Sequence, residues 1–547
     1  MELTETFEAL NRKPDDPAAL AALQKCLQNP APELASYFQE FRPDCHAALS
    51  AVLQRGGGFS NDLWSLATAQ VCARHGLAGA SVAVNPELLT ALAADPLCGL
   101  VLTEGFNKNL VLERCLTRAR RLLLGWYPHE QQRLPKLRPL LVAMAHQGFN
   151  NEFIWAVTDD EEQAVTALGE ELGRVVRTAD VGAAELPLLL YALYRPLAAH
   201  PEAAALAVLP LSNFASDLRS LITRTLLEPR NEAELHGSVP TLAGIEDSVS
   251  RSVRAQYEES PYPRWLQSTK SPQSVEERIR KTCPSFVWPV EFNGQRQQIL
   301  VAGCGTGQHS LQVAMGNPAA EVLAMDLSSA SLAYAMRMTE RYEVRNVTFL
   351  QGDLLALPRL GRKFHHIECA GVLHHIRDHA AAWAVLVDCL HTGGTLRIGV
   401  YSKVARLLVS HVRAAIQREG IGTTPAEVRH FRARLLEERE WASLLSLLVR
   451  VNDFFSLSMV RDLLFHVQEH QYTVEEIEII AQGLGLELLG VNLPRALRER
   501  AGIKPSDGST IGTFAQWRAC ERAYVGSMRM FQFWLQKPTQ TFAVPAA

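Results

Sequence analysis

The chain has 547 residues, which is more than one hydrophobic core usually serves, so we expect at least two domains. Hydrophobic residues make up 47% and charged residues 20%, a composition that excludes wholesale disorder and supplies enough apolar side chains for globular cores. The formal net charge of -4 gives no whole-chain signal for binding to nucleic acid or to an anionic membrane.

Cysteine placement and the lengths of the apolar runs narrow the class of protein further. The ten cysteines include no CxxC pair, which argues against a zinc ribbon and against a disulfide framework. The first residues are acidic and lack the basic and apolar regions of a secretory signal, and no apolar run approaches the ~20 residues of a membrane span. We therefore expect a cytoplasmic protein with no membrane contact.

Residues 1–228 are predicted to form an all-α domain. Alanine and leucine recur there at three- and four-residue spacing, proline and glycine interrupt the runs, and alternating segments typical of strands are few. The segments 86–93 and 109–124 have the pattern of consecutive amphipathic helices.

Residues 229–284 are predicted to be a linker that carries an arm over 257–265, Tyr-Glu-Glu-Ser-Pro-Tyr-Pro-Arg-Trp. Because two prolines lie close together, we expect the arm to be extended rather than helical. Two interpretations remain open. The arm is either a lid that folds over a ligand, with Arg264 pairing with a carboxylate of that ligand or with Glu258 or Glu259, or a plain strap between domains.

Residues 285–547 are predicted to form an α/β domain with a Rossmann-like, doubly wound sheet. Short apolar runs alternate with helix-compatible segments, and that order is typical of parallel strands joined by helical crossovers. Strands are expected at 298–302, 321–325, 347–351, 365–370 and 395–401, and helices at 308–315, 329–342 and 380–390.

The end of this domain departs from the simple alternation. Residues 403–471 are predicted to be a helical insertion, since a minimal fold needs only a short connection there. A helix over 473–484 follows, and strands at 486–493 and 530–536 are expected to close the sheet as an antiparallel pair.

A glycine-rich turn marks the point where the first strand of this domain leads into a helix. Gly303, Gly305 and Gly307 allow a tight turn and a close approach of the backbone to a ligand, and free amides at the helix N-terminus attract a carboxylate or a phosphate. Gln308 stands where the dinucleotide fingerprint has a further glycine, which disfavours NAD as the ligand without excluding it.

Acidic residues end the next two strands. Asp326 lies about twenty residues past the last glycine, where a carboxylate can accept hydrogen bonds from both ribose hydroxyls of an adenosine. Asp353 can accept from an adenine amine while a neighbouring backbone amide satisfies a ring nitrogen. Three strand ends are therefore expected to converge on one nucleoside.

The order of these motifs, GxGxG, strand-end Asp, Gly-Asp-Leu and then Gly371-Val-Leu-His-His-Ile376, resembles the class I S-adenosylmethionine-dependent methyltransferase family. The resemblance implies that the methionine part of S-adenosylmethionine contacts Gly303, Gly305 and Gly307, that the ribose contacts Asp326, and that the adenine contacts Asp353 and Leu354.

A looser resemblance extends beyond the sheet. The arm and the segments 147–152, 461–470 and 531–534 are similar to bacterial proteins in which a helical, often tetratricopeptide-like, region precedes such a methyltransferase domain. This grouping implies the domain order of the chain but supplies no substrate.

Two pairs of histidines are candidates for functional residues. His374 and His375 follow the fourth strand, whose carboxyl end is expected to face the transferred methyl group, so that either could act as a base or could instead pack behind the donor. His466 and His470 would share one face if their segment were helical. Two histidines without a third ligand are more often a polar helix face than a metal site, and we assign no metal.

The sequence thus predicts a methyltransferase with S-adenosylmethionine as donor and an unidentified acceptor. We expect a protein or peptide acceptor, gripped between the N-terminal helices and the insertion, and the near-neutral charge disfavours a nucleic acid. A catalytically silent S-adenosylmethionine-binding scaffold and a small-molecule methyltransferase remain alternatives.

Overall fold

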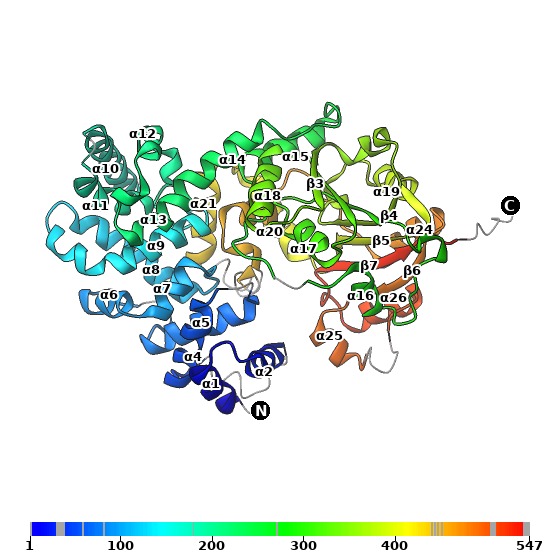
Figure 1. Cartoon of the computed structure of the whole chain (residues 1–547), viewed down its shortest axis with the longest axis horizontal. Coiled ribbons are helices and arrows are strands. Elements are labelled where there is room, and N and C mark those ends of the chain that lie inside the picture. Colours follow the sequence, from blue (N-terminus) through cyan, green and yellow to red (C-terminus); the bar gives the residue numbers. More distant parts are fainter. Residues whose placement is uncertain are drawn as a thin grey trace. The chain divides into compact units, whose positions relative to one another are not determined.

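The computed structural model describes residues 3–28, 39–56, 59–79, 82–178, 180–269, 272–438, 441, 445, 448–449, 452–503 and 510–539. The chain forms two compact units, each assembled from segments that are separate in the sequence. The helical unit comprises residues 1–231, 266–269 and 421–461, and the sheet unit comprises residues 232–265, 270–420 and 462–547 (Figure 1).

The helical unit consists mainly of helices that follow one another along the chain. They are α1 (Leu3–Arg12), α2 (Pro17–Gln28), α4 (Pro43–Gln54), α5 (Asn61–Arg74), α6 (Pro86–Ala93), α7 (Pro96–Thr103), α8 (Leu110–Trp126), α9 (Arg138–Asn150), α10 (Asp159–Arg177), α11 (Val181–Ala192), α12 (Ala203–Val208) and α13 (Ser216–Ile222).

Helix α10 shows why these segments fold as they do. A capping box begins it, because the Thr158 hydroxyl accepts from the Glu161 amide at 3.3 Å and the Glu161 carboxylate accepts from the Thr158 amide at 2.9 Å. Acidic residues occupy its first turn, and Arg174 and Arg177 lie in its last turn, which suits the helix dipole at both ends.

Helix α21 (Pro425–Glu437) joins the helical unit from a distant part of the sequence. Arg432 of α21 is buried and donates to both carboxylate oxygens of Glu113 on α8, at 2.6 and 2.9 Å. The Nε of Arg432 donates to the Phe454 carbonyl at 2.8 Å. Removing either partner of such a buried pair leaves an uncompensated charge, so this pair holds α21 to α8.

The sheet unit contains a seven-stranded sheet with the order β3-β2-β1-β4-β5-β7-β6. The strands β1 to β5 pair in parallel, and β7 is antiparallel to both of its neighbours. The strands are β1 (Gln298–Ala302), β2 (Glu321–Asp326), β3 (Val347–Gln351), β4 (Phe364–Ala370), β5 (Leu390–Tyr401), β6 (Glu487–Val491) and β7 (Met530–Gln536).

Helices cover both faces of this sheet. Ile299 and Val301 of β1 pack in one apolar cluster with residues of α16 (Val275–Arg280) and α17 (Gln308–Gly316). The alternating Leu300 and Ala302 pack in a second cluster with residues of α19 (His379–Asp388), α24 (Val474–Gly483) and α26 (Phe514–Ala523). The helices with residues in this unit are α14 (Glu228–His236), α15 (Ser248–Glu259), α16 (Val275–Arg280), α17 (Gln308–Gly316), α18 (Ser329–Arg341), α19 (His379–Asp388), α20 (Leu407–Glu419), α23 (Leu457–Phe465), α24 (Val474–Gly483), α25 (Arg495–Arg500) and α26 (Phe514–Ala523).

The predicted doubly wound sheet is confirmed, and its closing strands are antiparallel as expected. Two details differ from the prediction. The arm is helical in its first three residues, since α15 runs to Glu259, so an extended conformation over the whole of 257–265 is wrong. The stretch 403–471 does not stay together, because residues 421–461 belong to the helical unit and the remainder to the sheet unit.

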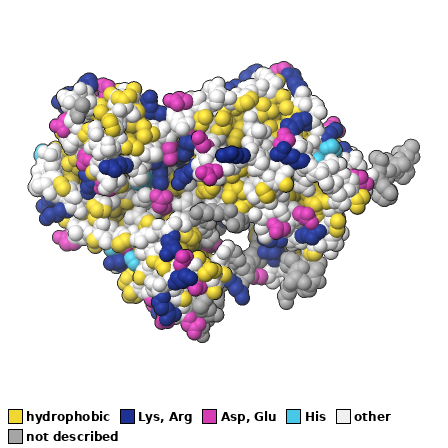
Figure 2. All heavy atoms as spheres, viewed as in Figure 1, with side chains coloured by type: hydrophobic (Ala, Val, Ile, Leu, Met, Phe, Trp, Pro, Cys, Tyr) yellow, Lys and Arg dark blue, Asp and Glu magenta, His cyan; other side chains and the backbone are white. Residues whose placement is uncertain are grey.

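Among the described residues, no single helix has both the length and the apolar character to cross a membrane; α6 and α7 reach both only when joined across a bend of 79°. Figure 2 shows acidic and basic side chains interspersed over the face in view, in keeping with the balanced composition.

Candidate functional site

A cavity of about 310 Å³ lies in the sheet unit where the parallel strands end. In doubly wound sheets, ligands bind at the carboxyl ends of the strands, beside the point where the strand order reverses. Here the first strand, β1, lies between β2 and β4, so the reversal is at β1 and the cavity lies beside it. The predicted site residues that line it are Gly303, Gly305, Asp326, Asp353, Leu354 and His375.

The glycine turn after β1 forms one wall of the cavity. Gly305 has φ +54°, and a Cβ at this position would lie 2.5 Å from the Tyr262 carbonyl oxygen, so only glycine fits beneath the arm. Gly307 does not line the cavity. It begins α17 with φ +82°, and a Cβ there would lie 2.4 Å from that of Ala335, so helix packing explains this glycine.

Asp326 connects this turn to the end of β2. One carboxylate oxygen accepts from the Gly305 amide at 2.7 Å, and the other accepts from the Ser328 amide at 3.0 Å. Burial raises the pKa of Asp326, while these amide hydrogen bonds act in the opposite direction. Each oxygen keeps a second lone pair for a ligand, as contact with two ribose hydroxyls requires.

Asp353 and Leu354 form the wall beyond β3. The Asp353 carboxylate accepts from the Leu355 amide at 2.9 Å and so caps the short helix η6 (Leu354–Leu360). The cap holds the side chain beside the cavity with a carboxylate oxygen left for a ligand.

The arm forms another wall of the cavity, next to the glycine turn, through Tyr257, Tyr262 and Pro263. It is fastened to that turn, because the Thr306 amide donates to the Tyr262 carbonyl at 3.3 Å and the Trp265 indole donates to the Thr306 carbonyl at 3.0 Å. Whether the arm moves as a lid stays a prediction.

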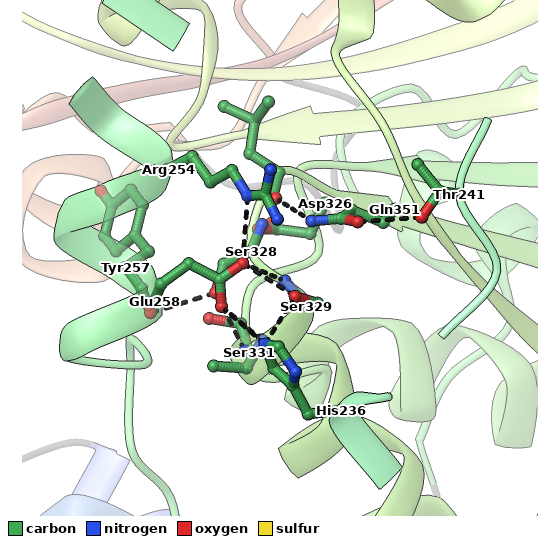
Figure 3. A network of polar contacts seen from close by, with 12 residues as sticks. His236, Thr241, Arg254, Tyr257, Glu258, Asp326, Ser328, Ser329, Ser331 and Gln351 are labelled. Carbon is green, nitrogen blue, oxygen red and sulfur yellow. Dashed lines mark hydrogen bonds and ion pairs between the residues drawn. The ribbon is translucent and has the colours of Figure 1, made fainter. Parts of the chain in front are cut away.

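Figure 3 shows how Glu258 anchors the end of α15 to the start of α18. Its carboxylate accepts from the Ser329 amide at 3.0 Å and the Ala330 amide at 2.9 Å, and it pairs with Arg254 at 3.1 Å. Burial alone would raise the pKa of Glu258, but these hydrogen bonds lower it below its usual range. Arg264 does not line the cavity; its guanidinium lies 5.6 Å from the centre of the Tyr334 ring.

The two histidines after β4 have different surroundings. His374 is fully buried outside the cavity lining, its ring lies 4.0 Å from that of Tyr401, and neither ring nitrogen has a hydrogen-bond partner among the described residues. His375 lines the cavity. Its Nδ1 donates to the Gln468 carbonyl at 2.7 Å, which leaves the Nε2 lone pair as an acceptor. Burial lowers the pKa of His375 to about 4, so the ring is neutral at pH 7.

His466 and His470 do not share a helix face, because α23 ends at Phe465. The ring of His466 stacks on that of His375, with 3.5 Å between the centres. Its Nδ1 accepts from the Gln468 amide at 3.1 Å, so Nε2 carries the proton and donates to the Tyr257 hydroxyl at 3.2 Å. His470 instead pairs with Glu476 at 2.6 Å.

Asp462, which lines the cavity, belongs to a group of three side chains that could hold a metal ion. Tyr257 donates to Asp462 at 2.6 Å, and Asp462 lies close enough to His375 and His466 for the three to share a metal ion. Because the Nε2 proton of His466 is directed at Tyr257, this arrangement favours a hydrogen-bond chain ending at Asp462 over a metal centre.

Glu368 and His309 also line the cavity, and sequence reasoning missed both. Glu368 is 1% exposed and pairs with His309, with Arg278 and, at 2.9 Å, with Arg397. A glutamate between Ile367 and Cys369 in β4 was the available signal, since buried carboxylates are paired.

Comparisons with known proteins identify the domain around this cavity. Residues 299–394 match the family model described as a methyltransferase domain. An uncharacterised protein of Synechococcus sp. is 31% identical over 267 residues, which cover 45% of this chain and 61% of that protein. Trans-aconitate 2-methyltransferase of Deinococcus radiodurans is 30% identical over 166 residues, which cover 30% of this chain and 61% of that protein.

The chain therefore spans less than two thirds of the length of these two relatives. A solved structure of PKMT2 from Rickettsia typhi in complex with AdoHcy is 17% identical, with a TM-score of 0.36, and the likeness covers 51% of this chain and 55% of that one. The predicted methyltransferase domain and its donor, S-adenosylmethionine, are confirmed by the family match. The roles of individual site residues stay predictions.

Proposed function

We propose that this chain, which carries a class I S-adenosylmethionine-dependent methyltransferase domain, transfers the donor methyl group to a nitrogen or oxygen of a protein or peptide, with His375 accepting the acceptor's proton. The observation that carries the proposal is the position of His375. It lines the same cavity as Gly303, Asp326 and Asp353, which are suited to hold the donor.

The residues of the cavity fit the donor by their chemistry. S-adenosylmethionine supplies a methyl group already activated by its sulfonium. Asp326 offers acceptors for the ribose hydroxyls, and Asp353 offers an acceptor for the adenine amine. Tyr257, Tyr262 and Pro263 line the cavity and place apolar surface beside the donor, and such surface strengthens polar contacts by displacing water when a ligand binds.

His375 has the tautomer that a base requires. The hydrogen bond from Nδ1 to the Gln468 carbonyl orients the ring and directs the Nε2 lone pair away from that carbonyl. The ring is neutral over the physiological range, because burial lowers the pKa of His375 to about 4. A neutral imidazole can accept a hydrogen bond from a hydroxyl or amine and position it in line with the methyl group.

A macromolecular acceptor is supported by the helical unit, which methyl transfer within the sheet unit does not itself need. Consecutive helices provide extended surfaces that suit chains better than metabolites. A small carboxylate is the second candidate acceptor, and it is favoured by the similarity to a methyltransferase named for trans-aconitate.

The test is to incubate the full chain with S-adenosylmethionine labelled in its methyl group and with extract of cells that lack the protein. Label in acid-precipitable, protease-sensitive material supports the protein acceptor, and label in an acid-soluble product that is separated from S-adenosylmethionine by chromatography supports the small carboxylate. An Asp326→Ala chain, which lacks both carboxylate oxygens, is the background control. Donor binding without transfer to either fraction contradicts the enzyme and favours a silent scaffold.

A further inference from the structure

A second cavity, of about 270 Å³, lies in the sheet unit and shares no lining residue with the donor cavity. It is bounded by α16 and the residues that follow it, by β5 and β7, and by the segment from the end of β6 through α25. Neither the methyltransferase match nor the proposed mechanism accounts for it.

The charge of this cavity has one sign. The cationic side chains that line it are Arg278, Lys281, Arg397 and Arg498, and no Asp or Glu is among the described residues of its lining. Glu368 lies behind two of them, pairing with Arg278 and, at 2.9 Å, with Arg397. One carboxylate therefore faces two guanidinium groups, and the positive charge of the cavity is only partly neutralised.

Contacts with residues of β7 hold two of these arginines in place. The guanidinium groups of Arg278 and Arg397 lie 5.5 and 5.8 Å from the centre of the Trp534 ring. Arg397 also donates to the Gln532 side-chain oxygen at 2.7 Å. Guanidinium groups oriented in this way lose little further freedom when an anion binds.

Two arginines of the lining each have a guanidinium nitrogen without a partner among the described residues. The Nε atoms of Arg278 and Arg498 are buried and have no hydrogen-bond partner among the described residues. Burial lowers the pKa of Arg278 to about 9, with a further contribution from the nearby Arg397, and lowers that of Arg397 to about 10. Buried donors without partners are costly, so the protein satisfies the guanidinium groups of Arg278 and Arg498 only in part.

We infer that this cavity binds a compact oxyanion with at least two negative charges, either a phosphate group or a pair of carboxylates. The planar fork of arginine matches the oxygen spacing of both groups, and hydrogen bonds between ionised partners are roughly twice as strong as neutral ones. Lys281, which lines the cavity and is exposed, adds a cation on a flexible side chain for the same ligand. The inference does not depend on methyl transfer.

The test is calorimetric titration of the full chain with inorganic phosphate and, separately, with citrate, at constant ionic strength. We expect one site for at least one of the two probes, and the probe that binds more tightly identifies phosphate or carboxylate as the preferred group. Arg498→Gln removes a charged donor and should weaken binding about tenfold or more. Arg500→Gln is the matched control, since Arg500 lies on the same helix over the Tyr524 ring and does not line the cavity.

Lys281→Gln provides a second variant at an exposed position, where the substitution leaves the fold intact. It should weaken binding by a smaller factor than Arg498→Gln. The inference is overturned if neither probe binds at millimolar concentration, or if both variants bind the probe as tightly as the Arg500→Gln control.

Discussion

Replacing Glu258 by alanine should loosen the arm and weaken donor binding, although Glu258 does not line the cavity. Its carboxylate accepts from two amides at the start of α18 and pairs with Arg254 (Figure 3). The neighbouring Tyr257 is part of the cavity wall, and α18 follows directly on the Asp326 turn. The carboxylate therefore connects two parts of the donor site.

The expected loss of donor affinity follows from the contacts that the Glu258→Ala substitution removes. Removing a side chain that caps a helix costs about 0.5–2 kcal/mol, and the charge at a helix N-terminus contributes about 0.3–1 kcal/mol more. If the arm must be in place for the donor to bind, a loss of about 1–2 kcal/mol appears as a ~5- to 30-fold rise in the Kd for S-adenosylmethionine. Titration calorimetry on the full chain measures this constant.

Glu259→Ala is the matched control, because Glu259 is the next residue and is exposed. The Glu259→Ala chain should bind S-adenosylmethionine with a Kd close to that of the unaltered chain. A Glu258→Ala chain that binds the donor within twofold of the unaltered chain would refute the reasoning, since the arm would then hold its position without this cap.

Three further predictions concern the cavity. His375→Gln should lower turnover more than donor affinity, whereas His374→Gln should act mainly on the thermal midpoint, because His374 lies outside the cavity; equal turnover in His375→Gln and the unaltered chain would remove the base role. The pKa of His375 falls from 6.5 to about 4 on folding, so the unfolded chain binds more protons than the folded chain between these pH values. The free energy of unfolding should therefore drop by up to ~3 kcal/mol as the pH falls from 6.5 to 4. Denaturant titrations of the His375→Gln chain should lack that part of the acid sensitivity. Gly305→Ala should weaken donor binding and expose the arm to protease, because the new Cβ would meet the Tyr262 carbonyl; unchanged cleavage would contradict this contact.

The strands of the sheet could be predicted because their signals are local. The segments 298–302, 347–351 and 530–536 were expected as strands with the bounds that the structure has. Each is a short run rich in apolar residues, and a glycine or an acidic residue follows the first two closely. The apolar pattern and the residues that end it therefore indicate the same strand. Acidic residues that follow apolar runs also predicted the positions of Asp326 and Asp353, which lie at strand ends and line the cavity.

The errors arise where distant contacts decide the structure. Pro261 restricts only the residue just before it, so α15 continues to Glu259 and the arm is irregular only after that point. His466 and His470 follow a helix that ends at Phe465, and their partners, Tyr257 and Glu476, come from other elements. Spacing along the chain does not contain this information.

The charged group around Glu368 was beyond local reasoning for the same reason. Arg278, His309 and Arg397 lie up to ninety positions from Glu368 in the sequence and meet only because β4 lies between β1 and β5 and beside the start of α17. The division of 403–471 between the two units is similar, because an amphipathic pattern shows that a helix is buried but not which core receives it.

The central claim is that the carboxyl ends of β1, β2 and β3 hold S-adenosylmethionine, and titration calorimetry of the full chain with this donor tests it most directly. We predict one site per chain, weakened by Asp326→Ala by ~2–3 kcal/mol, or ~30- to 150-fold, and weakened less by Asp353→Ala. Asp326→Asn, which keeps an acceptor oxygen for one of the two bound amides, should fall between the alanine variant and the unaltered chain. An Asp326→Ala chain that binds the donor with unchanged affinity would contradict the assignment of this cavity.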